Sequence, residues 1–145
     1  MKITVVGAGN VGAKSVDELA YREIANEVVV VDIKEGLAEG KGLDIWKKAP
    51  INLHVARTVG VTDDYSKTAG SEVVIITSGQ PRRPGMSRDD LIETNAGIVK
   101  SVTENVVKHS PDAIIIVVSN PLDVMTYQTH ITSKKPRTKV IGMAG

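Results

Sequence analysis

Six short runs of apolar residues recur along this 145-residue chain, and longer stretches with a helical spacing of apolar positions separate them. Several of the runs are rich in Val and Ile and apolar throughout, which is typical of parallel strands with both faces covered. The predicted strands are Lys2–Val6, Val28–Ile33, His54–Val59, Glu72–Thr77, Ala113–Val118 and Thr138–Ile141.

The stretches between these strands are predicted as helices. A stripe that includes Val11, Val16 and Leu19 follows the first strand with helical spacing. Further helices are predicted over Leu37–Trp46 (ended by Pro50), over Ser87–His109 and over Leu122–Thr132, and Asp63–Ser71 is predicted as a loop with one turn. Strands that alternate with helices favour right-handed crossovers. We therefore expect an α/β fold, a Rossmann doubly wound sheet of six parallel strands in the order 3-2-1-4-5-6.

The segment Gly7–Gly12 has the pattern G-x-G-x-x-G and lies between the first predicted strand and the first predicted helix. In this pattern Gly7 makes the tight turn, Gly9 lets the backbone approach a pyrophosphate, and Gly12 lets the helix pack on the strand. The N-terminus of the helix then offers free N–H groups to the phosphates. A glycine-rich turn that only packs is the alternative.

Asp32 favours the dinucleotide interpretation over that alternative. It closes the second apolar run at the distance from the glycines that a dinucleotide site requires. A carboxylate there accepts hydrogen bonds from both ribose hydroxyls of the adenosine and repels a 2′-phosphate, so NAD is preferred over NADP. Lys34 lies two residues further on, and we interpret it as an exposed charge that does not remove the effect of Asp32.

Composition excludes several functional classes. The formal net charge is +1, with 24% charged and 41% hydrophobic residues, so neither nucleic acid nor a membrane surface is predicted as a partner. The absence of cysteine excludes disulfides, thiolate metal sites and a cysteine nucleophile. Because Met1–Val6 leads directly into a strand, we expect no signal or transit peptide and a cytoplasmic location.

Several polar residues are predicted to converge on one crevice. In a sheet of this order the crevice lies between the first and fourth strands, so the loop that carries Arg82 and Arg83 faces the glycine turn and is predicted to be a mobile lid. Arg88 lies in the first turn of the next helix, where a cation opposes the helix dipole, which favours recognition of a carboxylate or phosphate. Asn120 follows the fifth strand and is predicted to point into the same crevice. Solvated loop charges and a simple Asn-Pro turn remain alternatives.

An acid–base group is missing from this set. Reduction of a ketone by hydride transfer needs a proton donor, most often histidine. None of His54, His109 and His130 follows the carboxyl end of a predicted strand, so we expect structural or surface roles for them. Neither a metal-binding spacing nor a nucleophile elbow occurs, and no metal site is predicted.

Motifs along the whole chain carry a resemblance to a known family. They are Gly7–Gly12 with Asp32, Pro81–Leu91 (PRRPGMSRDDL), Thr94–Ile98 (TNAGI), Val117–Asp123 (VVSNPLD) and Val140–Gly145 (VIGMAG). Together they resemble malate dehydrogenase, in its prokaryotic, lactate-dehydrogenase-like subgroup. The resemblance implies reversible oxidation of L-malate to oxaloacetate by hydride transfer to NAD.

The resemblance also implies roles for individual residues. Arg82 would bind the distal carboxylate of a dicarboxylate substrate, at a position where lactate dehydrogenases typically have glutamine. Arg88 would be catalytic, polarising the reacting carbonyl, and Asn120 would bond the substrate oxygen and form a cis peptide bond with Pro121. Cofactor contacts are assigned to Gly7, Ala8, Gly9, Asn10, Val11, Gly12, Asp32, Asn95, Val118, Ser119 and Asn120.

The end of the chain departs from the family pattern. The family continues into a second domain with the catalytic histidine, its aspartate partner and a second substrate arginine, so we expect residues 1–145 to be an NAD-binding domain without its C-terminal catalytic domain. Alone, it is expected to bind NAD without turnover, and the full-length enzyme is expected to be a homo-oligomer. Two alternatives stay open. Arg82 argues against a lactate dehydrogenase-type enzyme, and a non-catalytic NAD-sensing regulatory domain leaves Arg82, Arg88, Asn95 and Asn120 unexplained.

Overall fold

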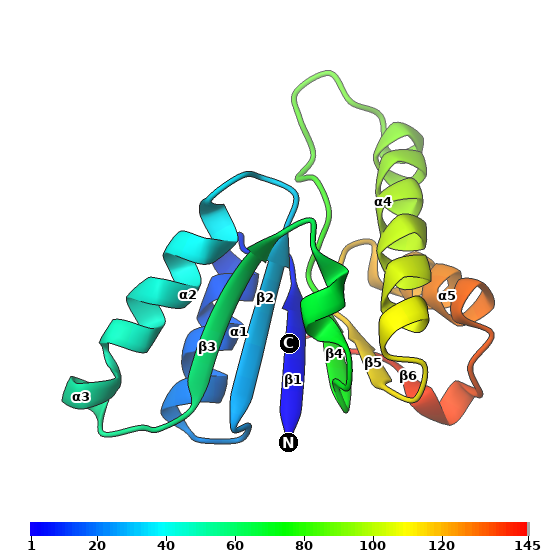
Figure 1. Ribbon diagram of the computed structural model, residues 1–145. Coiled ribbons are helices and arrows are strands. Elements are labelled where there is room, and N and C mark those ends of the chain that lie inside the picture. Colours follow the sequence, from blue (N-terminus) through cyan, green and yellow to red (C-terminus); the bar gives the residue numbers. More distant parts are fainter. Residues whose placement is uncertain (145) are drawn as a thin grey trace.

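A six-stranded sheet forms the centre of the computed structural model, which describes residues 1–144 (Figure 1). The strands lie in the order β3-β2-β1-β4-β5-β6, as predicted, and each neighbouring pair is parallel. Their bounds are β1 Lys2–Val6, β2 Glu27–Asp32, β3 Arg57–Thr62, β4 Val73–Ile76, β5 Ile114–Val117 and β6 Val140–Gly142. The predicted Rossmann topology is confirmed.

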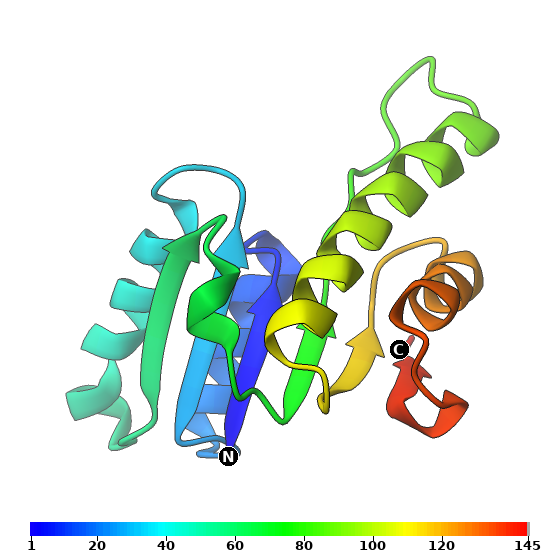
Figure 2. The same cartoon turned by 45° about the vertical axis from the view of Figure 1, so that its right-hand side comes forward.

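Helices cover both faces of the sheet (Figure 2). They are α1 Asn10–Tyr21, α2 Leu37–Lys47, α3 Ala49–Asn52, α4 Arg88–His109 and α5 Leu122–Ser133, with short 3-10 helices η1 Tyr65–Thr68 and η2 Arg137–Lys139. In β2, Val28 and Val30 belong to the core cluster under α1 and α2, whereas Val29 and Val31 belong to the cluster under α4 and α5. Both faces of β2 are therefore buried, which explains its unbroken apolar run.

Two strand boundaries and the role of Pro50 differ from the prediction for local reasons. The third strand begins at Arg57 rather than His54, because Leu53 adopts a left-handed conformation (φ 57°) and the N–H of His54 bonds to the carbonyl of Ala49. Pro50 does not end a helix, because it lies in the first turn of α3, where its missing N–H has no cost. The sixth strand begins two residues later than predicted, because Thr138 belongs to η2.

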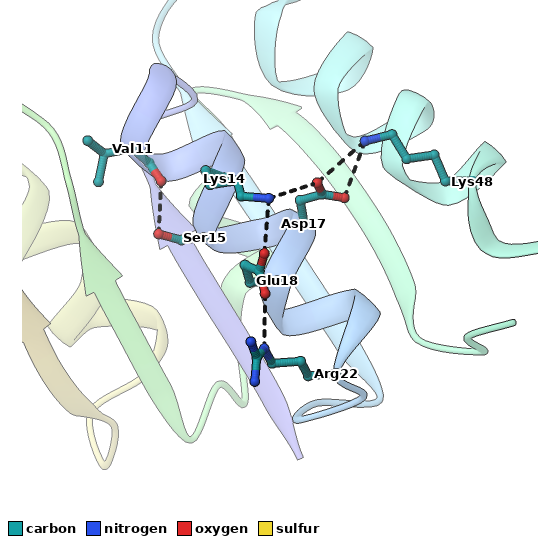
Figure 3. Close-up of polar contacts among 7 residues, drawn as sticks. All are labelled: Val11, Lys14, Ser15, Asp17, Glu18, Arg22 and Lys48. Atoms are coloured by element: carbon teal, nitrogen blue, oxygen red, sulfur yellow. Dashed lines mark hydrogen bonds and ion pairs between the residues drawn. The ribbon is translucent and has the colours of Figure 1, made fainter. Parts of the chain in front are cut away.

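Charged side chains join α1 to the end of α2 (Figure 3). The Lys48 ammonium lies 3.3 Å from a carboxylate oxygen of Asp17, and Glu18 pairs with both Lys14 (2.9 Å) and Arg22 (3.0 Å) along α1. Because these groups face water, each pair contributes little to stability. No helix within residues 1–144 is long and apolar enough to cross a membrane.

Helix α2 approaches β3 closely enough that both elements need glycine at the contact. A Cβ added to Gly60 would lie 1.8 Å from the carbonyl oxygen of Ala38, and one added to Gly42 would lie 2.7 Å from the nitrogen of Gly60. The Thr58 hydroxyl donates to the carbonyl of Gly42 at 2.6 Å across the same contact. This contact fixes the start of α2 beside the end of β2, where Asp32 lies.

We expect Gly60→Ala to lower the free energy of unfolding by about 3 kcal/mol, because the added methyl group overlaps backbone atoms of α2. The control is Gly40→Ala, on the exposed side of the same helix with no atom within 4 Å, which should gain about 0.5–1 kcal/mol from helix propensity. Urea unfolding followed by circular dichroism measures both variants. Equal stability of the two would contradict the close contact.

Candidate functional site

The glycine turn has the backbone geometry that its pattern predicts. Gly7 has φ 106°, a conformation that side chains rarely adopt, and a Cβ on Gly12 would lie 1.7 Å from the carbonyl oxygen of Gly7. Gly9, in contrast, has open space where its side chain would be. Within the described residues, no side chain caps the N-terminus of α1, so its first N–H groups are free to receive an anion.

Two hollows meet at this turn, at the carboxyl ends of the central strands. The first, about 300 Å³, is lined in part by Gly7, Gly9 and Asp32, and the second, about 420 Å³, extends from the same turn to Asn120. Both hollows share Gly9 and the segment Thr77–Gln80. They form one elongated cleft with the glycine turn at its middle, which suits a ligand with a phosphate centre and two cyclic ends.

Asp32 joins the glycine turn to the turn that follows β2. One carboxylate oxygen accepts the N–H of Ala8 at 2.7 Å, and the other accepts the N–H of Lys34 at 2.9 Å. Each carboxylate oxygen has a second lone pair, so both can still accept a ribose hydroxyl. The N–H of Ala8 is engaged by Asp32 and Ala8 itself is buried, so Ala8 is the one predicted cofactor contact that lines neither hollow.

The apolar wall of the first hollow contains side chains that sequence reasoning missed. They are Leu37, Tyr65, Ile98 and Val102, which come from α2, η1 and α4. Tyr65 is 7% exposed, and burial, reinforced by the nearby carboxylates of Asp63 and Asp32, raises its pKa to about 12. Helical periodicity indicated buried positions on α4, but nothing in the local sequence assigned any of them to a ligand cleft.

In the second hollow, Asn95 holds two loops together. Its amide oxygen accepts the N–H of Gln80 at 2.8 Å, and its amide nitrogen donates to the carbonyls of Gln80 (3.2 Å) and Asn120 (3.0 Å). Only 2% of Asn95 is exposed. Its direct contact with a cofactor stays a prediction, whereas its role in fixing the loops after β4 and β5 is visible in these bonds.

Ser119 adds a second link between the same loops, because its hydroxyl donates to the carbonyl of Ser78. Val118, Ser119 and Asn120 line the hollow as predicted, and the peptide bond between Asn120 and Pro121 is cis, as the family resemblance implied.

The predicted substrate arginines lie outside the cleft in this conformation. The loop between β4 and α4 rises away from the sheet (Figures 1 and 2). Arg82 is exposed on this loop, and Arg88 is exposed at the start of α4. The Arg82 guanidinium donates to the carbonyl of Met86 at 3.3 Å. Helix α4 begins with a capping box, since Ser87 and Asp90 exchange hydrogen bonds of 3.0 and 3.2 Å. Hydrogen bonds therefore fix the start of this loop, where Gln80 bonds to Asn95, and its end at Ser87. Arg82 lies between these two points, and Arg88 directly follows Ser87.

The histidines lie away from the cleft. His54 precedes β3 and is buried, His109 ends α4, and His130 lies in α5. None lines either hollow of the described residues, in agreement with the structural or surface roles expected for them.

Comparison with known proteins identifies the family. The sequence model of the lactate/malate dehydrogenase NAD-binding domain matches residues 1–142. The chain belongs to this family. It is 75% identical over its full length to a malate dehydrogenase of Cytophaga hutchinsonii, of which it covers 46%. The chain thus spans about half the length of this curated relative.

Solved structures of the family have the same fold. A malate dehydrogenase of Archaeoglobus fulgidus, in complex with NADH, superposes with a TM-score of 0.94 at 42% identity, over 99% of this chain and 49% of that one. A lactate dehydrogenase of Cryptosporidium parvum, in complex with lactic acid and the dinucleotide, superposes with a TM-score of 0.92 at 40% identity, over 99% of this chain and 45% of that one. The fold and the NAD-binding family assignment agree with the geometry of the cleft.

Burial of Tyr65 makes the free energy of unfolding depend on pH in the alkaline range. Because the pKa of Tyr65 is about 12 in the folded chain and about 10 in the unfolded chain, the unfolded state loses its proton first as the pH rises. We expect the free energy of unfolding to fall by about 2 kcal/mol between pH 10 and 12 on this account. Urea unfolding across that range measures it.

Tyr65→Phe should remove this part of the pH dependence. Tyr127→Phe is the matched control, because Tyr127 is 66% exposed on α5, and it should leave the slope as it is. An unchanged slope in the Tyr65→Phe variant would contradict the burial of this phenol.

Proposed function

We propose that this chain forms the NAD-binding half of a malate dehydrogenase, which exchanges a hydride between NAD and L-malate or oxaloacetate. The observation that carries the proposal is the elongated cleft. Asp32 lines the hollow on one side of the glycine turn, and Asn120 lines the hollow on the other side. A dinucleotide with its pyrophosphate on the turn would fill both hollows. Malate dehydrogenases among the relatives support the choice of reaction.

The residues of the cleft fit NAD. The open space at Gly9 and the uncapped N-terminus of α1 leave room and free N–H donors for the pyrophosphate. Asp32 would accept the ribose hydroxyls, and the apolar wall formed by Leu37, Tyr65, Ile98 and Val102 would pack against the adenine. When bound, the nicotinamide supplies the hydride acceptor or donor. This chain orients that ring between the loops that Asn95 and Ser119 hold.

The substrate would bind above Asn120, under the loop that follows β4. Asn120 offers an amide donor to the substrate oxygen, Arg88 would polarise the reacting carbonyl, and Arg82 would bind the second carboxylate. Both arginines must move toward the cleft, so the loop acts as a lid that excludes water when it closes. The lactate dehydrogenase alternative lacks a need for Arg82, because lactate carries one carboxylate, and an NAD sensor needs neither arginine.

A homo-oligomer in the cytoplasm, without nucleic acid or membrane partners, is the setting we propose for the whole protein. Ile51, Leu53 and Val55 form an apolar surface around α3, each with more than 80% of its area exposed. Surfaces of this kind are typical of protein interfaces. Burial of this surface between subunits would support the proposal.

The first test is binding of NADH to the 145-residue chain. We expect an increase in nicotinamide fluorescence on titration with NADH. Asp32→Asn should weaken binding at least about tenfold, because a carboxylate that accepts the ribose hydroxyls is lost and an NH₂ group faces the N–H of Ala8 or Lys34. Asp44→Asn removes the same charge from the side of α2 that faces α1, outside the cleft, and should bind NADH like the parent chain. Oxidation of NADH in the presence of oxaloacetate by this chain alone would refute the expectation that it lacks the acid–base group.

The second test concerns the substrate. It uses a fusion protein in which this chain is joined to the part of the Cytophaga hutchinsonii relative that the chain does not match. In that protein, Arg82→Gln should lower the preference for oxaloacetate over pyruvate by about tenfold or more, because one carboxylate loses a charged partner. The preference is measured as the ratio of kcat/KM values. Arg83→Gln, on the neighbouring residue of the lid, is the control and should leave the ratio unchanged. Equal ratios in both variants would overturn the role proposed for Arg82.

A further inference from the structure

A chain of hydrogen bonds outside the cleft connects α2 to the turn that follows Asp32. The N–H of Gly36 donates to the hydroxyl of Thr62 at 3.3 Å, and that hydroxyl donates to the carboxylate of Glu39 at 2.7 and 2.9 Å. Thr62 ends β3 and pairs in register with Asp32 at the end of β2. Glu39 is therefore held at the end of β3, which is the strand next to β2. The end of β2 carries Asp32, whose carboxylate would bind the adenosine ribose.

Glu39 is well placed to carry a permanent negative charge. It lies in the first turn of α2, where the positive end of the helix dipole favours a carboxylate. The hydrogen bond from Thr62 lowers the pKa of Glu39, so the side chain is ionised at neutral pH. Among the neighbouring charges, Lys34 and Glu35 in the turn are opposite in sign, and Asp63 after β3 adds another negative group. Beyond Asp32 itself, Glu39 and Asp63 thus add negative charge near the carboxyl ends of β2 and β3.

We propose that Glu39 is a second determinant of cofactor choice, which acts beside Asp32 to disfavour a 2′-phosphate on the adenosine ribose. This inference rests on the proposed binding of NAD in the cleft. Asp32 would touch the ribose, whereas Glu39 acts at a distance through its charge. Through Thr62 it also holds the turn at Gly36 in place.

The size of the effect follows from Coulomb's law. A 2′-phosphate carries nearly two negative charges, and a unit charge within about 10 Å of it in a water-like dielectric changes its binding by about threefold to fivefold. Because Glu39 is exposed, salt screens this repulsion over about 8 Å at physiological ionic strength. The contribution should therefore be measurable at low salt and small at high salt.

Glu39→Gln separates the charge from the hydrogen bond. The amide oxygen of glutamine can still accept from Thr62, so the turn keeps its support. Titrations of the 145-residue chain with NADPH and with NADH, in about 20 mM and about 500 mM salt, measure the two affinities by nicotinamide fluorescence. We expect NADPH to bind about threefold to fivefold more tightly in the variant at low salt, with NADH changed less than about twofold.

Two sets of controls distinguish charge from structure. Asp44→Asn on the same helix removes an equal charge farther from the turn and should leave the ratio of NADPH to NADH affinity unchanged. Thr62→Val keeps the charge of Glu39 but removes the hydroxyl, so both cofactors should lose affinity by a similar factor, and Thr62→Ser should restore it.

The possible outcomes separate this inference from the proposed function. If the parent chain binds NADH but Glu39→Gln leaves the NADPH to NADH ratio unchanged, Glu39 has no part in cofactor choice and the inference fails alone. The same conclusion follows if the change persists at high salt, because a charge effect must be screened. If the parent chain does not bind NADH at all, the proposed function fails and the inference fails with it.

Discussion

The hydrogen bond from the Ala8 N–H to the Asp32 carboxylate is the constraint on which the site depends. It joins the glycine turn after β1 to the end of β2, and the second oxygen of the same carboxylate holds the turn that leads into α2. The turn at Gly7 is fixed from the other side by β4, since the Thr77 hydroxyl donates to the carbonyl of Val6 at 3.0 Å. Three adjacent strands therefore meet at one short segment, and the cleft takes its shape from that junction.

This junction explains why the geometry of the glycine turn could be predicted from the sequence. Each of its requirements is local: a glycine with positive φ, a glycine without room for a Cβ, and an acid at the end of the next strand. Such requirements fix the number of residues between the glycines and between the glycines and the acid, so the pattern can be read from the sequence. The strand order followed for a similar reason, because alternating strands and helices permit few connections. The capping box at the start of α4 is also local, because it involves only Ser87 and Asp90, three positions apart.

The features that sequence reasoning missed depend on contacts between distant segments. Tyr65, Ile98 and Leu37 come together in one wall although three different elements carry them. The late start of β3 depends on the left-handed conformation of Leu53, which has no glycine to signal it. Asn95 was assigned to the cofactor by its motif, but its amide is engaged by the backbone of Gln80 and Asn120. Only the folded chain shows that these backbone groups lie around it.

The two ends of the cleft differ in how firmly they are built. At the end near Asp32, the buried strands and the apolar wall from α2, η1 and α4 set the shape of the hollow without a ligand. At the other end, the loop from Pro81 to Gly85 is exposed, and Arg82 donates to the carbonyl of Met86 at the end of the same loop. An arginine that is left in water keeps its hydration, and it gains strength as a carboxylate partner only when the loop closes and water leaves. Recognition of the dinucleotide is thus a property of the rigid sheet, whereas the proposed selection of a dicarboxylate would require a change in the loop.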